Sequence, residues 1–204
     1  MTGEDQGRLR LFVAIELPET WLTALGELQD GMKAALAADA QTAGVRLRWV
    51  RPEGIHLTLK FIGEVAPARL EPIREHLALA VPEPPAIPLS LGGTGSFQDR
   101  RAPRVIWAGV ESPQAESMRR LAEAIETWLT AAGVPRQRRG FAAHLTLARL
   151  PNDLPDDIRR RIAQVTNSVE APGPAPFTVD GVSLMRSHLG PGGARYERLG
   201  RWPV

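Results

Sequence analysis

The chain has 204 residues, of which 43% are hydrophobic and 24% are charged, as expected of a globular protein with one domain or two small lobes. The absence of cysteine excludes disulfides, thiolate catalysis and cysteine-based zinc sites, and the short apolar runs, all interrupted by charge, argue against a membrane span or a signal peptide. The net charge is only +2 although the pI is about 9.6, because Lys33 and Lys60 are the only lysines and arginine stays charged to high pH, so the pI is weak support for nucleic-acid binding.

The first half of the chain alternates strand and helix patterns. Residues 1–7 are polar and are expected to be disordered, and Pro-rich residues 81–88 interrupt the pattern near its end. The predicted strands are 8–18, 45–50, 55–61 and 89–91, and the predicted helices are 20–38 and 68–80.

The second half begins with a predicted loop, "GGTGSFQDRRAP" at 92–103. A helix over 114–132 should end at Gly133 in a left-handed cap. The other predicted elements are strands over 104–110, 141–147, 177–187 and 194–202, and a helix over 156–169.

Direct strand-to-strand connections through short loops favour antiparallel pairing, and hence an α+β fold. Each half has helices and a strand with the word His-Leu-Thr-Leu, at 56–59 and again at 144–147. We therefore predict a bilobal fold, in which two pseudo-symmetric, mainly antiparallel sheets with outer helices surround a central cleft. Residues 8–204 should form this single domain, with one motif in each lobe.

Side chains alternate between the two faces of a strand, so each word presents histidine and threonine together, opposite an apolar face. In the first copy this alternation places Ile55, Leu57, Leu59 and Phe61 on one face, and His56, Thr58 and Lys60 on the other. In the second copy Phe141, Ala143, Leu145 and Leu147 lie opposite His144 and Thr146. Two such strands would line a cleft.

Two histidines and two hydroxyls suit phosphoryl chemistry without a metal. One imidazole can accept a proton from water and the other can protonate the leaving oxygen, since the ordinary histidine pKa of about 6.5 makes both forms available near neutral pH. Threonine hydroxyls can bind the non-bridging phosphate oxygens. In-line displacement requires groups on opposite sides of phosphorus, and two lobes provide them.

Two other interpretations of the repeated word compete with this one. A single His-x-Thr on a strand is usually structural, but two copies with the same alternation are far more specific. Zinc binding by the two histidines is disfavoured because neither word contains a carboxylate. His76 and His188 are assigned no role. Arginine clusters at 100–104, 136–139 and 159–161 are interpreted as solvated helix ends and loops, with phosphate contact as the alternative.

The chain resembles the two-histidine phosphoesterase superfamily and, within it, the LigT-like RNA 2′,3′-cyclic phosphodiesterases, once called 2′-5′ RNA ligases. The resemblance rests on "RLFVAIELP", "HLTLKFIGEV", "RVIWAGV", "HLTLAR" and "ARYERLGRW". It implies a V-shaped basic cleft, no cofactor and no metal. It also implies hydrolysis of a terminal 2′,3′-cyclic phosphate on RNA to a 2′-phosphate, with reversible 2′-5′ ligation as a further activity.

The resemblance also implies residue roles. His56 would protonate the departing O3′, His144 would accept a proton from water, and the threonines of the two words would hold the phosphate. Arg149 matches an arginine that contacts the phosphate, and Phe12 an aromatic residue near the terminal base. Strict alternation places Arg149 opposite His144, so a strand end or a bulge is required for it to reach the cleft.

Two alternatives to RNA end hydrolysis stay open. One is hydrolysis of a small cyclic nucleotide or another cyclic phosphate, and the other is a non-catalytic nucleotide- or RNA-binding module on the same fold. The expected partners are RNA 3′ ends with a cyclic phosphate, such as tRNA fragments, or nucleotides. We expect a cytoplasmic monomer without membrane association.

Overall fold

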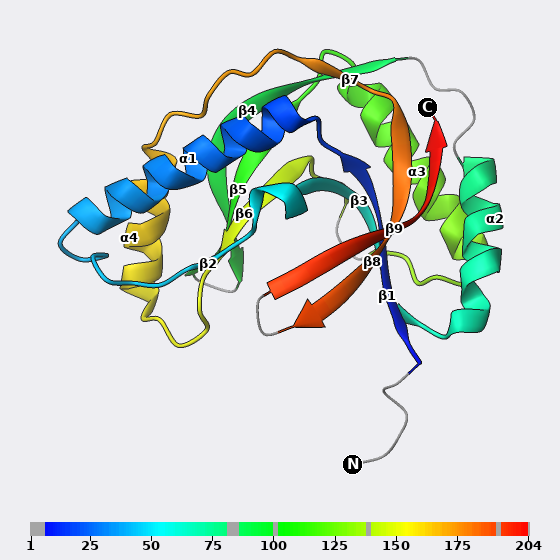
Figure 1. The fold of residues 1–204 in the computed structure, drawn as a ribbon, viewed down its shortest axis with the longest axis horizontal. Coiled ribbons are helices and arrows are strands. Elements are labelled where there is room, and N and C mark those ends of the chain that lie inside the picture. The colour runs from blue at the N-terminus through cyan, green and yellow to red at the C-terminus, as the bar shows by residue number, and fades with distance from the viewer. Residues whose placement is uncertain (1–6, 81–85, 100–101, 138–139, 191–192, 204) are drawn as a thin grey trace.

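The computed structural model describes residues 7–80, 86–99, 102–137, 140–190 and 193–203 (Figure 1). Almost all of the N-terminal segment expected to be disordered lies outside the described residues. The strands are β1 Leu9–Glu16, β2 Arg48–Trp49, β3 His56–Val65, β4 Ile87–Asp99, β5 Ala102–Glu111, β6 His144–Arg149, β7 Phe177–Val179, β8 Gly181–Gly190 and β9 Gly193–Pro203. The helices are α1 Glu19–Ala38, α2 Leu70–Ala80, α3 Ala115–Ala131 and α4 Asp156–Asn167, with short 3-10 turns at Pro52–Gly54 and Pro67–Arg69.

The strands form one curled antiparallel sheet in the order β7-β4-β5-β6-β3-β1-β8-β9, with β2 paired to β6. The α+β class is confirmed. The two separate sheets expected from the sequence are instead two halves of one sheet, joined where Leu57 of β3 pairs with Leu145 of β6. The two strands that carry the repeated word are therefore neighbours at the centre of the fold.

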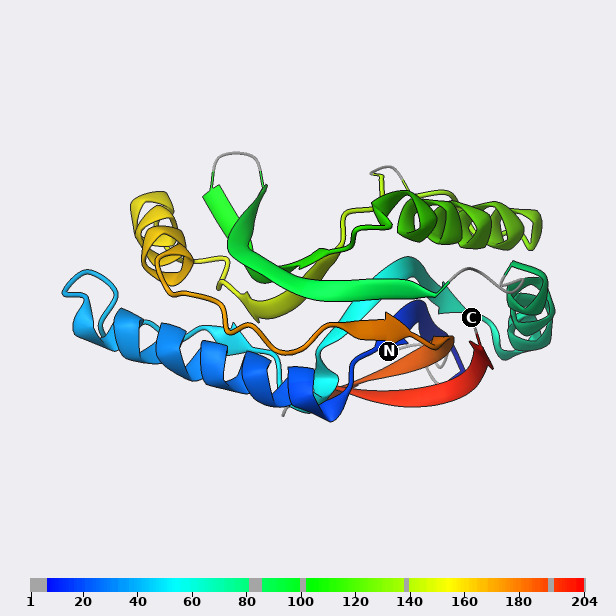
Figure 2. The same cartoon turned by 90° about the horizontal axis from the view of Figure 1, so that it is seen from above.

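Helices gather at the two ends of the molecule (Figures 1 and 2). Helix α1 packs on α4, which also contacts β4 and β5, while α2 packs on α3, which contacts β3. Each pair takes one helix from each half of the sequence, so the halves are interleaved rather than separate. One hydrophobic core runs through both ends, from Trp21 and Leu25 of α1 to Leu77 of α2 and Ile125 of α3. None of the helices in the described ranges has the length and apolarity needed to cross a membrane.

The predicted loop over 92–103 is wrong for most of its length, because β4 continues to Asp99 and pairs with β5 from Ser90 to Asp99. Its glycines suggest a loop, but Gly95 has a packing role here. Gly95 lies opposite Trp107, and a Cβ at Gly95 would lie 2.2 Å from the indole ring. Glycine is thus required for the indole to cover the strand.

Other boundaries shift by a few residues. The strands predicted over 45–50 and 141–147 are Arg48–Trp49 and His144–Arg149, and residues 177–187 divide into β7 and β8. The predicted left-handed cap of α3 is confirmed: Gly133 has φ of 78°, and the N–H of Val134 donates to the Leu129 carbonyl at 2.9 Å.

Candidate active site

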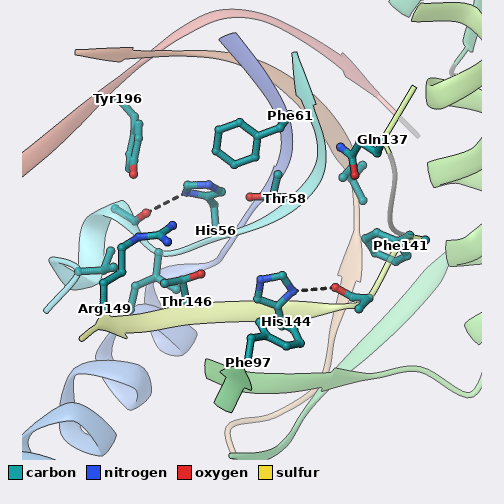
Figure 3. A pocket seen from close by; sticks show the side chains of 16 residues that line it. His56, Thr58, Phe61, Phe97, Gln137, Phe141, His144, Thr146, Arg149 and Tyr196 are labelled. Carbon is teal, nitrogen blue, oxygen red and sulfur yellow. Dashed lines mark hydrogen bonds between the residues drawn. The ribbon is translucent and has the colours of Figure 1, made fainter. Parts of the chain in front are cut away.

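A cavity of about 370 Å³ lies over the junction of β3 and β6 (Figure 3). Both predicted pairs line it: His56 and Thr58 from β3, and His144 and Thr146 from β6. Leu57 and Leu145, between them, are fully buried on the opposite face. The alternation predicted from the repeated word thus brings all four polar side chains into one pocket.

Each histidine is held by the backbone two residues before it. The Nδ1–H of His56 donates to the carbonyl of Gly54 at 2.9 Å, and that of His144 donates to the carbonyl of Ala142 at 2.7 Å. Since a carbonyl only accepts, the proton of each neutral ring is on Nδ1, and Nε2 is left as the basic atom. Both rings therefore have the tautomer needed to accept or, once protonated, to donate a proton at Nε2.

The electrostatic surroundings of the two rings are similar in burial and differ in charge. Burial lowers the pKa of His56 below its ordinary value, and the hydrogen bond to Gly54 partly opposes this by raising it. A positive charge on His144 lowers the pKa of His56 further, and the Glu16 carboxylate raises it. Burial also lowers the pKa of His144, against the hydrogen bond to Ala142, and the Arg149 charge lowers that pKa further. A nearby carboxylate favours a proton on His56, and a nearby guanidinium disfavours one on His144.

Both strands contain a β-bulge at the same position of the repeated word. In β3 the pairing with β1 passes from Thr58 to Lys60 without Leu59, and in β6 the pairing with β5 passes from Thr146 to Ala148 without Leu147. The extra residue exchanges the two faces beyond it. Burial along the first six residues is the same in the two strands.

The bulge in β3 overturns the alternation predicted there. Lys60, expected beside His56, is fully buried, and Phe61, expected in the core, is 46% exposed and lines the pocket. In β6 the same shift buries Ala148 and brings Arg149 into the pocket wall. The bulge that Arg149 requires is therefore present.

The bulge in β6 is stabilised by α1. The carbonyl of Leu147 accepts hydrogen bonds from the Nε2 of Gln29, at 3.0 Å, and from the N–H of Val50, at 2.9 Å. Gln29 is 2% exposed and also donates to the Val50 carbonyl at 2.8 Å. A buried amide thus satisfies backbone groups near the bulge.

Phe12 supports His56 from below instead of lining the cavity. Its side chain is 1% exposed, stacks on the His56 ring with centroids 4.6 Å apart, and contacts Phe61 and Tyr196. In this arrangement the ring of Phe12 has no face available to a base. Phe61 and Phe141, among others, line the pocket with aromatic surface instead.

Other lining residues were not anticipated. Tyr196, the only tyrosine of the chain, meets His56 edge-on at 5.0 Å, and Phe97 meets His144 edge-on at 4.6 Å. Burial raises the pKa of Tyr196, so its hydroxyl stays protonated. In Figure 3, Arg149 and Tyr196 lie on one side of the histidines, and Gln137 and Phe141 on the other. The only sequence signal for Tyr196 was that the chain has a single tyrosine. Phe97 gave no signal, because it lies in the segment that was predicted to be a loop.

A buried ion pair anchors the segment before the second motif. Lys60 donates through Nζ to Glu126 of α3 at 2.8 Å and to the Pro135 carbonyl at 2.7 Å. Glu126 also accepts from the N–H of Gln137 at 2.8 Å. The anchored segment leads to Ala142, whose carbonyl fixes His144.

The other polar residues singled out in the sequence, where the structure describes them, do not line the pocket. His76 bonds the Pro72 carbonyl, and His188 pairs with Glu197. Within the arginine clusters, Arg104 donates to Asn152 and Arg161 pairs with Asp39, while residues 100, 101, 138 and 139 lie outside the described residues. Among the described residues, no three histidine, aspartate or glutamate side chains form a cluster able to hold a metal ion.

A family model for LigT-like phosphoesterases matches residues 18–107 and 109–196, which include both motifs. The chain belongs to the LigT-like phosphoesterase family. Among its relatives, a Methanothermobacter thermautotrophicus protein named RNA 2′,3′-cyclic phosphodiesterase is 30% identical over 192 residues, covering 94% of this chain and 97% of the relative. A Thermus thermophilus protein of the same name is 32% identical, covering 96% and 90%.

Solved structures agree with this LigT-like assignment. The crystal structure of a Thermus thermophilus protein superposes with a TM-score of 0.71 at 28% identity, covering 95% of this chain and 97% of the other. Escherichia coli LigT in complex with 3′-AMP superposes with a TM-score of 0.67 at 26% identity, covering 97% and 98%. The superpositions cover almost the whole chain.

Proposed function

We propose that this LigT-like protein hydrolyses the terminal 2′,3′-cyclic phosphate of RNA to a 2′-phosphate by acid–base catalysis. The observation that carries the proposal is the matched pair of histidines, each with Nδ1 bound to a backbone carbonyl and Nε2 left free at the same pocket. Relatives that match along almost the whole chain are named RNA 2′,3′-cyclic phosphodiesterases. Both motifs are intact, which favours a catalyst over a binding module.

In the proposed reaction His144 accepts a proton from water at Nε2 while the water oxygen bonds to phosphorus. The P–O3′ bond breaks, and His56, protonated at Nε2, gives its proton to O3′. Thr58 and Thr146 donate hydrogen bonds to the non-bridging oxygens, which carry charge in the transition state. Exchange of protons with solvent then restores the pair, and no step uses a metal.

The division of roles follows the charges around the rings. His56 pairs across the strands with Glu16, which favours the protonated form that an acid needs. His144 lies near Arg149, which favours the neutral form that a base needs. Arg149 is also placed to bind a phosphate oxygen from the pocket wall.

The two sides of the pocket suit different parts of a nucleotide. Phe61 and Phe141 offer apolar rings, and Gln137 offers an amide, so we place the terminal base on their side of the histidines. Arg149, on the other side, then faces the phosphate and sugar. Phe12 is buried and stacks on His56, so it orients the imidazole of the general acid and does not contact the nucleobase of the substrate.

The proposal is tested with a dinucleotide that ends in a 2′,3′-cyclic phosphate, beside the matching 2′,3′-cyclic mononucleotide. A higher kcat/KM for the dinucleotide than for the mononucleotide supports an RNA end as substrate. Faster turnover of the mononucleotide would favour a small cyclic nucleotide instead. Binding of both without turnover would reduce the protein to a binding module, and the His144→Ala variant separates enzymatic turnover from contamination.

We propose that the substrates are RNA 3′ ends left by cleavage, tRNA fragments among them, and that the reverse 2′-5′ ligation uses the same two histidines. We also propose a monomer acting in the cytoplasm, which sedimentation and cell fractionation would check.

A further inference from the structure

A second cavity of about 410 Å³ lies beside the catalytic pocket and shares Arg149 with it. Its basic lining residues come from three neighbouring strands: Arg48 from β2, Arg149 from β6 and Arg104 from β5. Asp153 is the one carboxylate in its lining, so the cavity is net positive. The catalytic chemistry described above makes no use of this space.

The sheet itself places the arginines together. Arg48 and Arg149 are directly paired across β2 and β6, and directly opposed side chains share a face with Cβ atoms about 5 Å apart. Val105 pairs with Arg149 from the other side, and Arg104 precedes it in β5. Arg104 is held in place by its hydrogen bond to Asn152. Arg48, on the same face, can therefore act with Arg149 on one ligand.

The charge on Arg48 and Arg149 is not neutralised within the described part of the chain. Neither forms an ion pair there, in contrast to Arg161 with Asp39 or Arg201 with Asp180. Paired arginine forks that are exposed to solvent suit the oxygens of a phosphodiester. A carboxylate ligand would fit the charge equally but has no link to the catalytic pocket, whereas a nucleic-acid chain does.

Resting on the proposed function, we propose that this cavity binds the phosphodiester that joins the terminal nucleotide to its 5′ neighbour. With the base beside Phe61 and Phe141 and the cyclic phosphate between the histidines, the 5′ side of the ribose leads toward Arg149. The next phosphate then lies between Arg149 and Arg48. The site gives the protein a preference for RNA ends over cyclic mononucleotides.

The test compares kcat/KM for a cyclic-ended dinucleotide and for the matching cyclic mononucleotide. Arg48→Ala should lower the dinucleotide-to-mononucleotide ratio about tenfold, through KM, as expected for loss of one charge-assisted hydrogen bond. Arg48→Lys should retain part of the preference. The slope of log KM against log salt for the dinucleotide should fall by about 0.7. Arg74→Ala on α2, at the far end of the molecule, removes the same charge and should leave the ratio unchanged (Figure 1).

A dinucleotide whose internal phosphate is a neutral methylphosphonate should behave like the mononucleotide. The inference is overturned if Arg48→Ala lowers kcat/KM equally for both substrates or for neither. It is also overturned if the methylphosphonate dinucleotide is still preferred over the mononucleotide to the full extent. Absence of turnover with either substrate would instead refute the proposed function. In that case the Kd values of the 3′-phosphorylated dinucleotide and mononucleotide are compared between the wild-type protein and Arg48→Ala. That comparison tests phosphodiester binding in the second cavity independently of catalysis.

Discussion

The sharpest structural prediction concerns Lys60, which the bulge in β3 turns from the pocket face into the core. Its side chain is fully buried, and its ammonium group contacts Glu126 Oε1 at 2.8 Å and the Pro135 carbonyl at 2.7 Å. The substitution Lys60→Met keeps the length of the side chain and removes the charge. It leaves the Glu126 carboxylate and one backbone carbonyl without this donor.

Removing one partner of a buried ion pair costs about 3–5 kcal/mol. The Glu126 side chain is 16% exposed and still accepts from Gln137, so partial hydration places the expected loss at the lower end, about 3 kcal/mol. For a chain of this size each kcal/mol lowers Tm by about 2–4 °C, so Tm should fall by about 6–12 °C. Urea unfolding and thermal melting both measure this loss.

Lys33, the only other lysine, provides the matched control. It pairs with Asp30 at the surface and is 47% exposed, so Lys33→Met should cost less than about 1 kcal/mol. Lys60→Met should also lower turnover, because the anchored segment carries the Ala142 carbonyl that fixes His144. If the two lysine variants unfold alike, Lys60 is not buried against Glu126 and the bulge is wrongly placed.

Further predictions address the chemistry. Activity should survive EDTA, and loss on chelation with recovery on adding zinc or magnesium would contradict the proton-transfer scheme. Thr58→Val and Thr146→Val should each lower turnover with little change in Tm, because substrate is the proposed partner of each hydroxyl; a large fall in Tm with normal turnover would make them structural. The kcat/KM profile should be bell-shaped and centred below about pH 6.5, since burial lowers the pKa of both histidines. Glu16→Gln should move the alkaline limb of this profile to lower pH, because His56 must stay protonated and the substitution removes the charge that raises the His56 pKa. The control Glu71→Gln on α2 should leave the profile in place. An unmoved alkaline limb in Glu16→Gln would argue against His56 as the general acid.

The repeated word predicted which histidines and threonines line the central pocket, because strand alternation places the polar side chains of each copy on one face. Alternation alone places His56 with Thr58 and His144 with Thr146, and two identical words imply one shared pocket. The α+β class followed in the same way from short connections between strands. These features depend on local sequence, which is visible in one chain.

The bulges depend on pairing between distant strands, and no residue type announces them. Leu59 and Leu147 are ordinary strand residues, yet skipping them sends Lys60 inward and Phe61 and Arg149 outward. The need for Arg149 to reach the cleft hinted at one bulge, and the matching spacing in the first copy could have predicted the other. Lys60 and Phe61 were therefore assigned to the wrong faces.

Tertiary contacts also decided the roles of Phe12 and the glycine-rich segment of β4. Phe12 lies on the strand beside His56, but the rings of His56, Phe61 and Tyr196 cover it, and only the fold shows this. The glycines of β4 have the composition of a loop, but Gly95 makes room for Trp107. Sequence composition could not distinguish a loop from a strand packed against an indole ring.

The most direct test of the two-histidine mechanism is product analysis on an RNA dinucleotide with a 2′,3′-cyclic end, using the wild-type protein and its His56→Ala and His144→Ala variants. Products are separated against 2′- and 3′-phosphate standards. The mechanism predicts that the wild-type product is the 2′-phosphate, and that each variant loses about a hundredfold or more in turnover. The double variant should lose far less than the product of the two single losses, because the pair acts as a unit. A dominant 3′-phosphate would require the acid and base roles to be exchanged or the substrate to be reoriented, and a fully active His144→Ala protein would contradict the mechanism outright.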